Sequence, residues 1–251
     1  IGNTIIDLSA LVYYDNSTIS DIGGGDDTLI SGKTTFIELD GGIGNDILDA
    51  RLSSNADLFG GDDNDILYGG QFSNEYAGGK GADKMTGSSD TQSEDYFLFK
   101  QGDSTSVAFT DQGNLGLGNG DTFVFNGGAD IILSGLSPAK HLDSSVNSPL
   151  YGDGLGLYSN SYSYGDILSQ MTSIPLNGLA TDQGYFFQQG SYAEATGIFT
   201  VSDNGTDALI VYDGDSSNGV SQTGLVLANT NSAHLVTEIW GGIYLDPPPI
   251  G

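Results

Sequence analysis

Four aspartates recur at nearly equal intervals in the first third of the chain, each in the same local setting. Asp27, Asp46, Asp65 and Asp83 are separated by 19, 19 and 18 residues. Glycines precede each aspartate, and a large apolar residue follows it two positions later. The apolar residues are Leu29, Leu48, Leu67 and Met85. Because carboxylates and main-chain carbonyls are ligands of hard cations, this spacing points to a repeated metal site.

The residues around each aspartate follow the nonapeptide G-G-x-G-x-D-x-U-x, in which U is large and apolar. This pattern is typical of a calcium-binding parallel β-roll. In such a roll each nonapeptide forms half a turn, a glycine-rich bend followed by a short strand. The glycines are needed because the bend requires positive φ and close main-chain approach. The bend positions that we expect to surround the metal are Gly23, Gly25, Gly41, Gly42, Gly44, Gly60, Gly61, Asp63, Gly78, Gly79 and Gly81.

Each interval between the four aspartates has about the length of two nonapeptides. The sequence therefore predicts that only every second half-turn keeps the pattern. Stacked turns pair their strands in parallel about 4.8 Å apart, which places the four aspartates in a ladder on one edge. In the intervening half-turns we expect Leu39, Phe59, Tyr76 and Phe97 to point inward. The corresponding ligand positions hold Ile37, Asp57, Asn74 and Asp95, at uneven intervals of 20, 17 and 21 residues. The sequence thus predicts one good metal edge and one poor edge, with Asp57 and Asn74 as additional ligands.

Calcium is the expected ion because it takes six to eight oxygen ligands at roughly 2.3–2.6 Å. An ion between two turns would complete its shell from both, and four aspartates leave three gaps, so we expect about three or more ions. Without metal, carboxylates in neighbouring turns repel one another. Asp63 in place of the third glycine and Lys84 beside Asp83 weaken the last gap. An acidic glycine-rich linker is the alternative, and four in-register copies argue against it.

Composition limits the classes of function that the chain can have. Its 251 residues include six Lys and Arg against 33 Asp and Glu, a net charge of −27, which argues against nucleic acids and anionic membrane surfaces as partners. There are no cysteines, so disulfides cannot stabilise the fold. No apolar run approaches the roughly 18 residues of a membrane span. The chain opens at Ile1 without a signal peptide, which we interpret as a processed product or a fragment.

The pattern divides the chain into three parts within an all-β fold. Residues 1–22 are expected to cap the roll as one more irregular turn, residues 23–99 to form the roll, and residues 100–251 to form a β-rich C-terminal domain. Runs rich in β-branched and aromatic residues predict the strands of that domain. They lie at 121–125, 130–133, 184–187, 198–201, 208–212 and 224–227. Helices are expected only at 164–172 and, ambiguously, at 232–240.

The four nonapeptides resemble the repeats-in-toxin (RTX) family of type I-secreted bacterial proteins, a match that covers about a third of the chain. Residues 78–87, 96–99 and 102–104 are similar to the exit of the roll in serralysin-type proteases. Residues 197–215 are similar to the C-terminal β region of many cyanobacterial and proteobacterial RTX proteins. The resemblance implies a calcium-loaded roll, an extracellular or cell-surface location and an uncleaved C-terminal export signal. The Leu-Asp-Pro-Pro-Pro sequence at 245–249 departs from that signal.

The chain lacks the common catalytic motifs of enzymes that accompany such rolls, and we predict that it is not an enzyme. There is no H-E-x-x-H and no G-x-S-x-G. A glycosidase-like carboxylate pair stays open in so acidic a chain, although calcium or turn chemistry explains most carboxylates. His141 and His234, the only histidines, are expected to be surface residues rather than a metal pair.

Two hypotheses of function follow from these observations. The first is a secreted structural protein, a surface-layer, matrix or filament subunit that folds and self-assembles, or attaches to the cell surface, with calcium. The second is the calcium-dependent secretion and folding module of a larger hydrolase or adhesin. Four tyrosines between 151 and 164 form a sugar site, a subunit contact or a plain surface loop. The tyrosines are Tyr151, Tyr158, Tyr162 and Tyr164.

Overall fold

The computed structural model describes the roll almost completely and the C-terminal region in part. The described residues are 2–14, 16–20, 23–88, 95–98, 107–110, 122–125, 127–133, 140–143, 158–159, 172–174, 184–213, 223–229, 235–237 and 243–245. Within these ranges every regular element is a strand, as the sequence predicted. The same ranges hold no helix with the length and apolar character needed to cross a bilayer.

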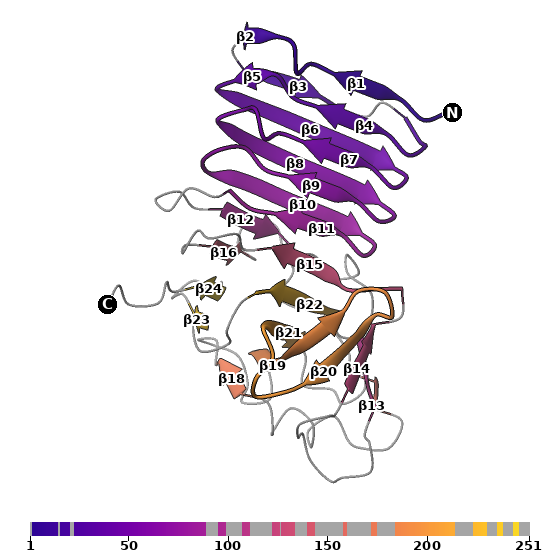
Figure 1. Cartoon of the computed structure of the whole chain (residues 1–251), viewed down its shortest axis with the longest axis vertical. Coiled ribbons are helices and arrows are strands. Elements are labelled where there is room, and N and C mark those ends of the chain that lie inside the picture. The colour runs from indigo at the N-terminus through magenta and orange to yellow at the C-terminus, as the bar shows by residue number, and fades with distance from the viewer. Residues whose placement is uncertain are drawn as a thin grey trace.

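The N-terminal half is a parallel β-solenoid whose turns stack along the long axis of the molecule (Figure 1). One sheet, the first sheet, contains β1 (Ile5–Asp7), β4 (Thr28–Ile30), β7 (Ile47–Asp49), β9 (Ile66–Tyr68), β11 (Lys84–Thr86) and β15 (Asp130–Leu133). The facing second sheet contains β3 (Ser17–Ile19), β6 (Phe36–Ile43), β8 (Asn55–Asp62), β10 (Asn74–Lys80), β12 (Asp95–Leu98) and β16 (Lys140–Asp143). A short third pair joins β2 (Val12–Tyr14) to β5 (Lys33–Thr34). Neighbouring strands in all three sets run parallel.

The stacked turns share one narrow core that explains the apolar residue after each aspartate. Inward side chains of the first sheet, Leu29, Leu48, Leu67 and Met85, are fully buried, as predicted. Those of the second sheet are Leu39, Leu58, Tyr76 and Phe97, also fully buried. The rings of Tyr76 and Phe97 stack with centroids 4.6 Å apart. The prediction of Phe59 as an inward residue was wrong: Leu58 pairs with Leu39 and Tyr76 in the ladder, so Phe59 lies on the outer face.

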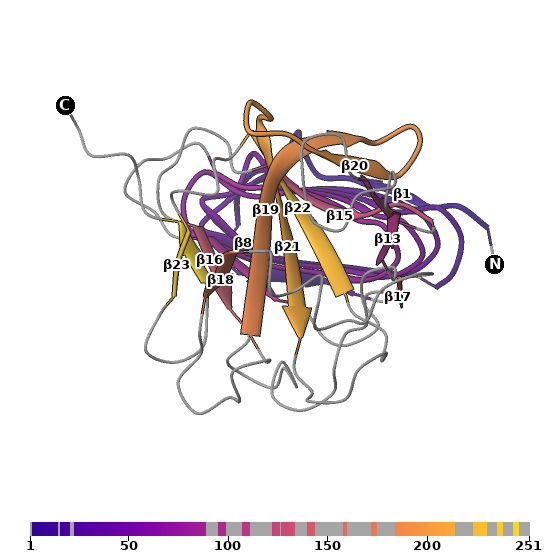
Figure 2. The same ribbon diagram turned by 90° about the horizontal axis from the view of Figure 1, so that it is seen from below.

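The C-terminal strands extend both sheets of the roll rather than forming a separate body. The first sheet continues past β15 through β22 (Thr223–Ala228), β21 (Asp207–Asp213), β19 (Gly184–Ala193), β20 (Ile198–Val201), β14 (Thr122–Phe125), β13 (Val107–Thr110) and β17 (Tyr158–Ser159). The strand β18 (Thr172–Ile174) pairs with β19. Beyond β16 the second sheet continues through β24 (Ile243–Leu245) and β23 (Leu235–Thr237). Viewed along the long axis from this end, β19, β21 and β22 lie across the flattened loops of the roll (Figure 2).

Several sequence predictions can be compared with this topology. The β-rich C-terminal region is confirmed, and the sheets run through the expected boundary at residue 99 without interruption. The helix at 232–240 was wrong for residues 235–237, which form β23. Of the helix predicted at 164–172, only Thr172 is described, and it begins β18. Among the tyrosines of the 151–164 cluster, Tyr158 begins β17 and the others lie outside the described residues. His141 lies in β16, and His234 lies outside the described residues.

Candidate metal centre

The predicted aspartate ladder is present on one edge of the roll, which we call the aspartate edge. It comprises the bends that lead from the second sheet into the first. The four aspartates are about 1% exposed, and each accepts a backbone N–H from the preceding turn through Oδ1. Asp27 N donates to Asp46, Asp46 N to Asp65, and Asp65 N to Asp83, at 2.7 to 2.9 Å. The ladder begins at the N-terminal turn, where Thr4 N donates to Asp27 Oδ1 at 2.5 Å.

The second carboxylate oxygen of these aspartates is the unusual feature of the edge. Oδ2 of Asp27, Asp46 and Asp65 is buried and has no hydrogen-bond partner. A buried carboxylate oxygen without a partner is strongly unfavourable, because burial removes its hydration. The arrangement therefore requires a proton or a cation on each of these oxygens.

The electrostatics of the ladder lead to the same requirement. Burial, opposed by the Asp46 N–H and reinforced by repulsion from Asp83, Asp46 and Asp63, raises the pKa of Asp65 to about 8. Burial is also the main cause that raises the pKa of Asp46, and the charge of Asp27 adds to it. A cation between the turns would reverse this effect, because a nearby positive charge favours the ionised carboxylate.

Main-chain oxygens converge on the unpartnered carboxylate oxygens. At Gly41, the point where a Cβ would stand lies within 2.8 Å of both Asp46 Oδ2 and the Gly60 carbonyl oxygen. One turn on, Asp65 Oδ2 and the Gly78 carbonyl oxygen flank Gly60 in the same way. A calcium ion that bound both oxygens of such a pair would lie about 2.3–2.6 Å from each of them. A side chain at either glycine would fill the space between these oxygens.

The bend glycines are required for backbone reasons as well. Gly42, Gly61 and Gly79 have φ of 99°, 119° and 99°, and a Cβ at Gly61 would collide with the Gly42 carbonyl oxygen. The fourth pattern position also has positive φ in every copy, including the non-glycine Asp63 at 85°. Aspartate tolerates this region better than most residues, so the departure at 63 leaves the bend intact.

A fifth aspartate continues the ladder and was missed from the sequence. Asp83 N donates to Asp130 Oδ1 at 3.0 Å, and Asp130 is fully buried. It is separated from Asp83 by 47 residues, so the regular spacing could not reveal it. The signal was local: Gly127-Gly128-Ala129-Asp130-Ile131-Ile132 repeats the end of the pattern, and both glycines have positive φ.

A second, outer ladder stands beside the first and was also missed. Asn3 Oδ1 accepts Asp26 N, Asp26 Oδ1 accepts Asn45 N, and Asn45 Oδ1 accepts Asn64 N. Asn64 Oδ1 then accepts Ala82 N at 2.8 Å, and the ladder ends because alanine has no acceptor. These side chains are exposed and satisfy the backbone of the bend, so the inner aspartates need not do so with both oxygens.

The opposite edge is formed by the turns from the first sheet into the second. The sequence predicted Asn74 as a metal ligand there, whereas in the structure its polar groups bond to protein groups. The buried carboxylate of this edge, Asp95, accepts Asn74 N and Nδ2 on Oδ1, at 3.1 and 2.9 Å, and Ser88 N on Oδ2. Asn74 in turn accepts Gly70 N. Protein donors thus satisfy this group without an ion.

Asp57 does not lie at the ligand position to which the sequence spacing assigned it. Ala56 pairs with Ile37 and Asn74, so the true register of this half-turn is one residue earlier. Asp57 stands on the outer face of the second sheet between Glu38 and Glu75. Burial, then repulsion from Glu75 and Glu38, raises its pKa to about 6. The predicted intervals of 20 and 17 residues came from this slip, whereas the interval of 21 between Asn74 and Asp95 is real.

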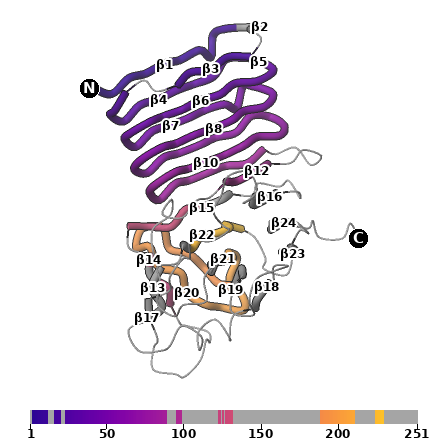
Figure 3. The backbone as a smooth tube through the Cα atoms, turned by 180° about the vertical axis from the view of Figure 1, so that it is seen from behind, coloured from indigo at the N-terminus to yellow at the C-terminus, as the bar shows by residue number. Residues whose placement is uncertain are grey.

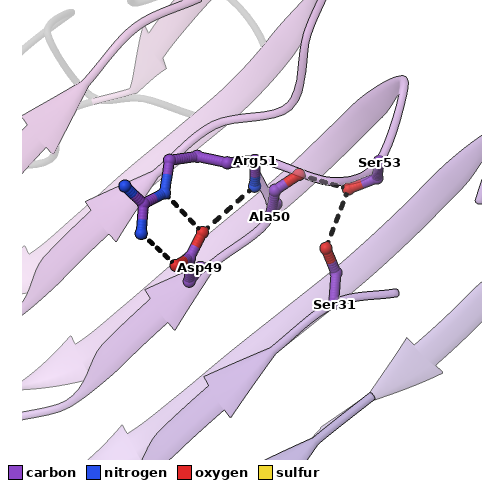
Figure 4. A network of polar contacts seen from close by, with 5 residues as sticks. All are labelled: Ser31, Asp49, Ala50, Arg51 and Ser53. Carbon is purple, nitrogen blue, oxygen red and sulfur yellow. Dashed lines mark hydrogen bonds and ion pairs between the residues drawn. The ribbon is translucent and has the colours of Figure 1, made fainter. Parts of the chain in front are cut away.

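Figure 4 shows how further polar groups of the opposite edge find protein partners. Ser53 Oγ donates to the Ala50 carbonyl oxygen at 2.6 Å and lies 3.3 Å from Ser31 Oγ. Arg51, the only arginine of the chain, pairs with Asp49 through Nε and Nη2. Its guanidinium also covers the ring of Tyr68, 4.7 Å from the centroid.

The carboxylate and carbonyl oxygens of the aspartate edge are suitable ligands for a hard cation that prefers oxygen. Among the described residues, no three acidic or histidine side chains converge on one point. An ion at this edge would therefore take one or two carboxylates and complete its shell with carbonyl oxygens, a mixture that suits calcium. Comparison with protein-family models, with curated proteins and with solved structures gives no match for this chain.

Proposed function

We propose that this chain is a secreted, calcium-binding structural protein of the RTX type, whose roll folds around ions held along the aspartate edge. The observation that carries the proposal is the row of buried aspartate oxygens at Asp27, Asp46 and Asp65 that have no hydrogen-bond partner. A polar or charged group in that state is rare in folded proteins unless a ligand completes it.

The residues that would hold the ions are the ladder aspartates and the carbonyls of the glycine bends. Each ion would lie between two turns, with the gaps at 27/46, 46/65 and 65/83 now joined by a fourth at 83/130. Bound calcium supplies positive charge that keeps buried carboxylates ionised and links successive turns. The protein contributes fixed bends that bring the Gly60 carbonyl oxygen close to the Asp46 carboxylate and the Gly78 carbonyl oxygen close to the Asp65 carboxylate.

A calcium-dependent fold suits an extracellular structural role. Binding to the folded state alone stabilises it by RT ln(1 + [L]/Kd), about 2.7 kcal/mol per ion at a hundredfold excess over Kd. Several such ions contribute as much as the whole stability of an ordinary domain, about 5–15 kcal/mol. The chain would then stay unfolded where calcium is scarce and fold where it is abundant. Zero cysteines and a net charge of −27 are compatible with this behaviour.

The test is a count of bound calcium by isothermal titration on chelator-stripped protein. We expect about three or more ions per chain and a loss of about two in Asp65→Asn. Asp95→Asn is the matched control, because it changes a buried aspartate on the opposite edge and should leave the count unchanged. No binding at millimolar calcium, or equal losses in both variants, contradicts the proposal.

A further inference from the structure

A small cleft opens on the opposite edge of the roll, away from the aspartate ladder. Its volume is about 320 Å³, near the lower end of the roughly 300–1,000 Å³ of small-molecule sites. Three successive turns line it, those that follow β7, β9 and β11, and the turns of the roll lie one below another along this edge (Figure 3). The first turn contributes Arg51, the second contributes residues 68–71 and the third contributes residues 86–88.

Main-chain hydrogen bonds fix the walls of the cleft. Gly69 N donates to the Thr86 carbonyl oxygen at 3.1 Å, which ties the second turn to the third. Gln71 N donates to the Ser53 carbonyl oxygen at 3.0 Å, which ties the second turn to the first. The stacking of the turns therefore builds the shape of the cleft, and a ligand that enters it has little of the protein to order.

Arg51 brings side-chain N–H groups to the cleft that have no partner in the described part of the chain. Its Nε and Nη2 donate to the two carboxylate oxygens of Asp49, as the dashed lines in Figure 4 show. The guanidinium also lies over the ring of Tyr68, 4.7 Å from the centroid, which helps to hold it in place. A guanidinium has five N–H donors in one plane, so this pairing leaves a second parallel pair on the Nη1–Nη2 edge. The Arg51 side chain is 64% exposed, so a ligand can reach that edge.

Two further lining residues carry polar groups that lack a partner among the described residues. They are the Tyr68 hydroxyl and the Gln71 side-chain amide. Each of these groups can both donate and accept a hydrogen bond. The cleft thus offers a fixed pair of donors together with two groups of either polarity.

Charge restricts the kind of ligand that suits the cleft. Burial disfavours the ionised form of Asp49, but hydrogen bonds from Arg51 outweigh burial and lower its pKa, so both partners are ionised and their charges cancel. The net charge of −27 on the chain repels an anion, and the guanidinium repels a cation. An apolar ligand would cover the polar groups without pairing them, which is unfavourable. A neutral ligand with several hydroxyl groups has none of these disadvantages.

We infer that the cleft binds a neutral sugar, with two neighbouring hydroxyl oxygens accepting from the Nη1–Nη2 edge of Arg51. Adjacent hydroxyls of a pyranose ring stand side by side, so their oxygens match two parallel N–H donors as the oxygens of a carboxylate do. Other hydroxyls of the ring pair with the Tyr68 hydroxyl and the Gln71 amide. The inference stands apart from the proposed calcium role, because main-chain hydrogen bonds of the opposite edge build this site.

The test uses the complete chain in millimolar calcium, with the methyl glycosides of glucose, galactose and mannose as neutral probes. Because the chain has one arginine, its proton–nitrogen correlation spectrum contains one arginine Nε–H signal, from a group that is bonded to Asp49. We expect this signal to shift, and the shift to saturate, with at least one of the three glycosides. Sodium glucuronate and sodium sulfate are the anionic probes, and they should bind more weakly than that glycoside.

Variants assign the contact to the cleft. Arg51→Lys keeps the charge but has no parallel pair of donors, so we expect a loss of affinity of about tenfold in saturation-transfer NMR. Gln71→Ala removes one hydrogen-bonding group and should weaken binding about two- to tenfold. Phe72→Ala is the matched control, because Phe72 is the next residue of the same turn, is 45% exposed and does not line the cleft. All three variants should keep the calcium count and the β circular dichroism of the parent, which separates a lost sugar site from a lost roll.

Three results overturn the inference. One is the absence of both an Nε–H shift and saturation transfer at hundreds of millimolar of each glycoside. Another is an affinity that Arg51→Lys leaves unchanged, or that Phe72→Ala lowers as much as Gln71→Ala does, which would place the sugar elsewhere. The third is tighter binding of glucuronate or sulfate than of any glycoside, which would make the cleft an anion site.

Discussion

The two edges of the roll are bends between the same two sheets, yet they treat buried carboxylates in opposite ways. On the opposite edge, Asp95 takes donors on both oxygens from Asn74 and Ser88. On the aspartate edge, Asp46 and Asp65 take one N–H each and bury the second oxygen without a partner. Burial alone therefore does not mark a metal ligand. The distinguishing property is a buried carboxylate oxygen that has no hydrogen-bond partner in the protein.

The largest effect should come from the backbone of the aspartate edge. Gly61→Ala places a Cβ against the Gly42 carbonyl oxygen at a φ of 119°. We expect a loss of about 3 kcal/mol or more, enough to unfold the roll, because strain and steric overlap add. Gly24→Ala is the control, since its nearest neighbour would lie at an ordinary 3.6 Å. Thermal unfolding in calcium measures both variants, and equal changes would contradict the bend geometry.

The second effect is a dependence on calcium concentration. In millimolar calcium, Asp65→Asn should lower the melting temperature, because the variant loses ions. As calcium is lowered towards the concentration at which the roll unfolds, this loss should shrink, because the parent also holds fewer ions there. Asp95→Asn should destabilise by about 1–3 kcal/mol at every calcium concentration at which the roll is folded, since an amide N–H then faces another donor. If the loss in Asp65→Asn does not depend on calcium, the two edges are not different in kind.

The third effect concerns the length of the ladder. Asp46, Asp65 and Asp83 each lie between two aspartates, whereas Asp27 and Asp130 each neighbour one. Substitution by alanine should remove about two ions at the three inner positions and about one at each end. Calorimetric titration of the five variants gives the counts. A loss of one ion at Asp83 would end the metal ladder at the last regular repeat and exclude Asp130 from it.

The smallest effect lies on the outer face of the second sheet. Asp57 has a pKa of about 6, above the ordinary 3.8, so the folded state binds its proton more tightly than the unfolded state does. Ionisation of Asp57 therefore lowers the free energy of unfolding as pH rises from about 4 through about 6. Asp57→Asn removes that cost, and its melting temperature should exceed that of the parent more at pH 8 than at pH 4. Equal differences at the two pH values would show that burial and the neighbouring carboxylates do not raise the pKa of Asp57.

The sequence predicted those parts of the fold where each position has a local cause. The inner residues Leu29, Leu48, Leu67 and Met85, and the four aspartates before them, follow from a pattern that fixes bend, strand and core together. The opposite edge has no such pattern, so its register was judged from spacing and slipped by one residue at Asp57. Asp130 was missed because strands inserted between the turns remove the regular interval, although the glycines before it keep the local signal.

The measurement that tests the account most directly is far-UV circular dichroism of the complete chain at pH 8 as calcium is added to chelator-stripped protein. We predict a β signal that appears with calcium, disappears with excess chelator, and is not restored by magnesium at the same ionic strength, because magnesium demands a tighter octahedral shell. A full β signal in excess chelator, unchanged by calcium, would show that the buried oxygens of the aspartate edge need no ion, and would contradict the account.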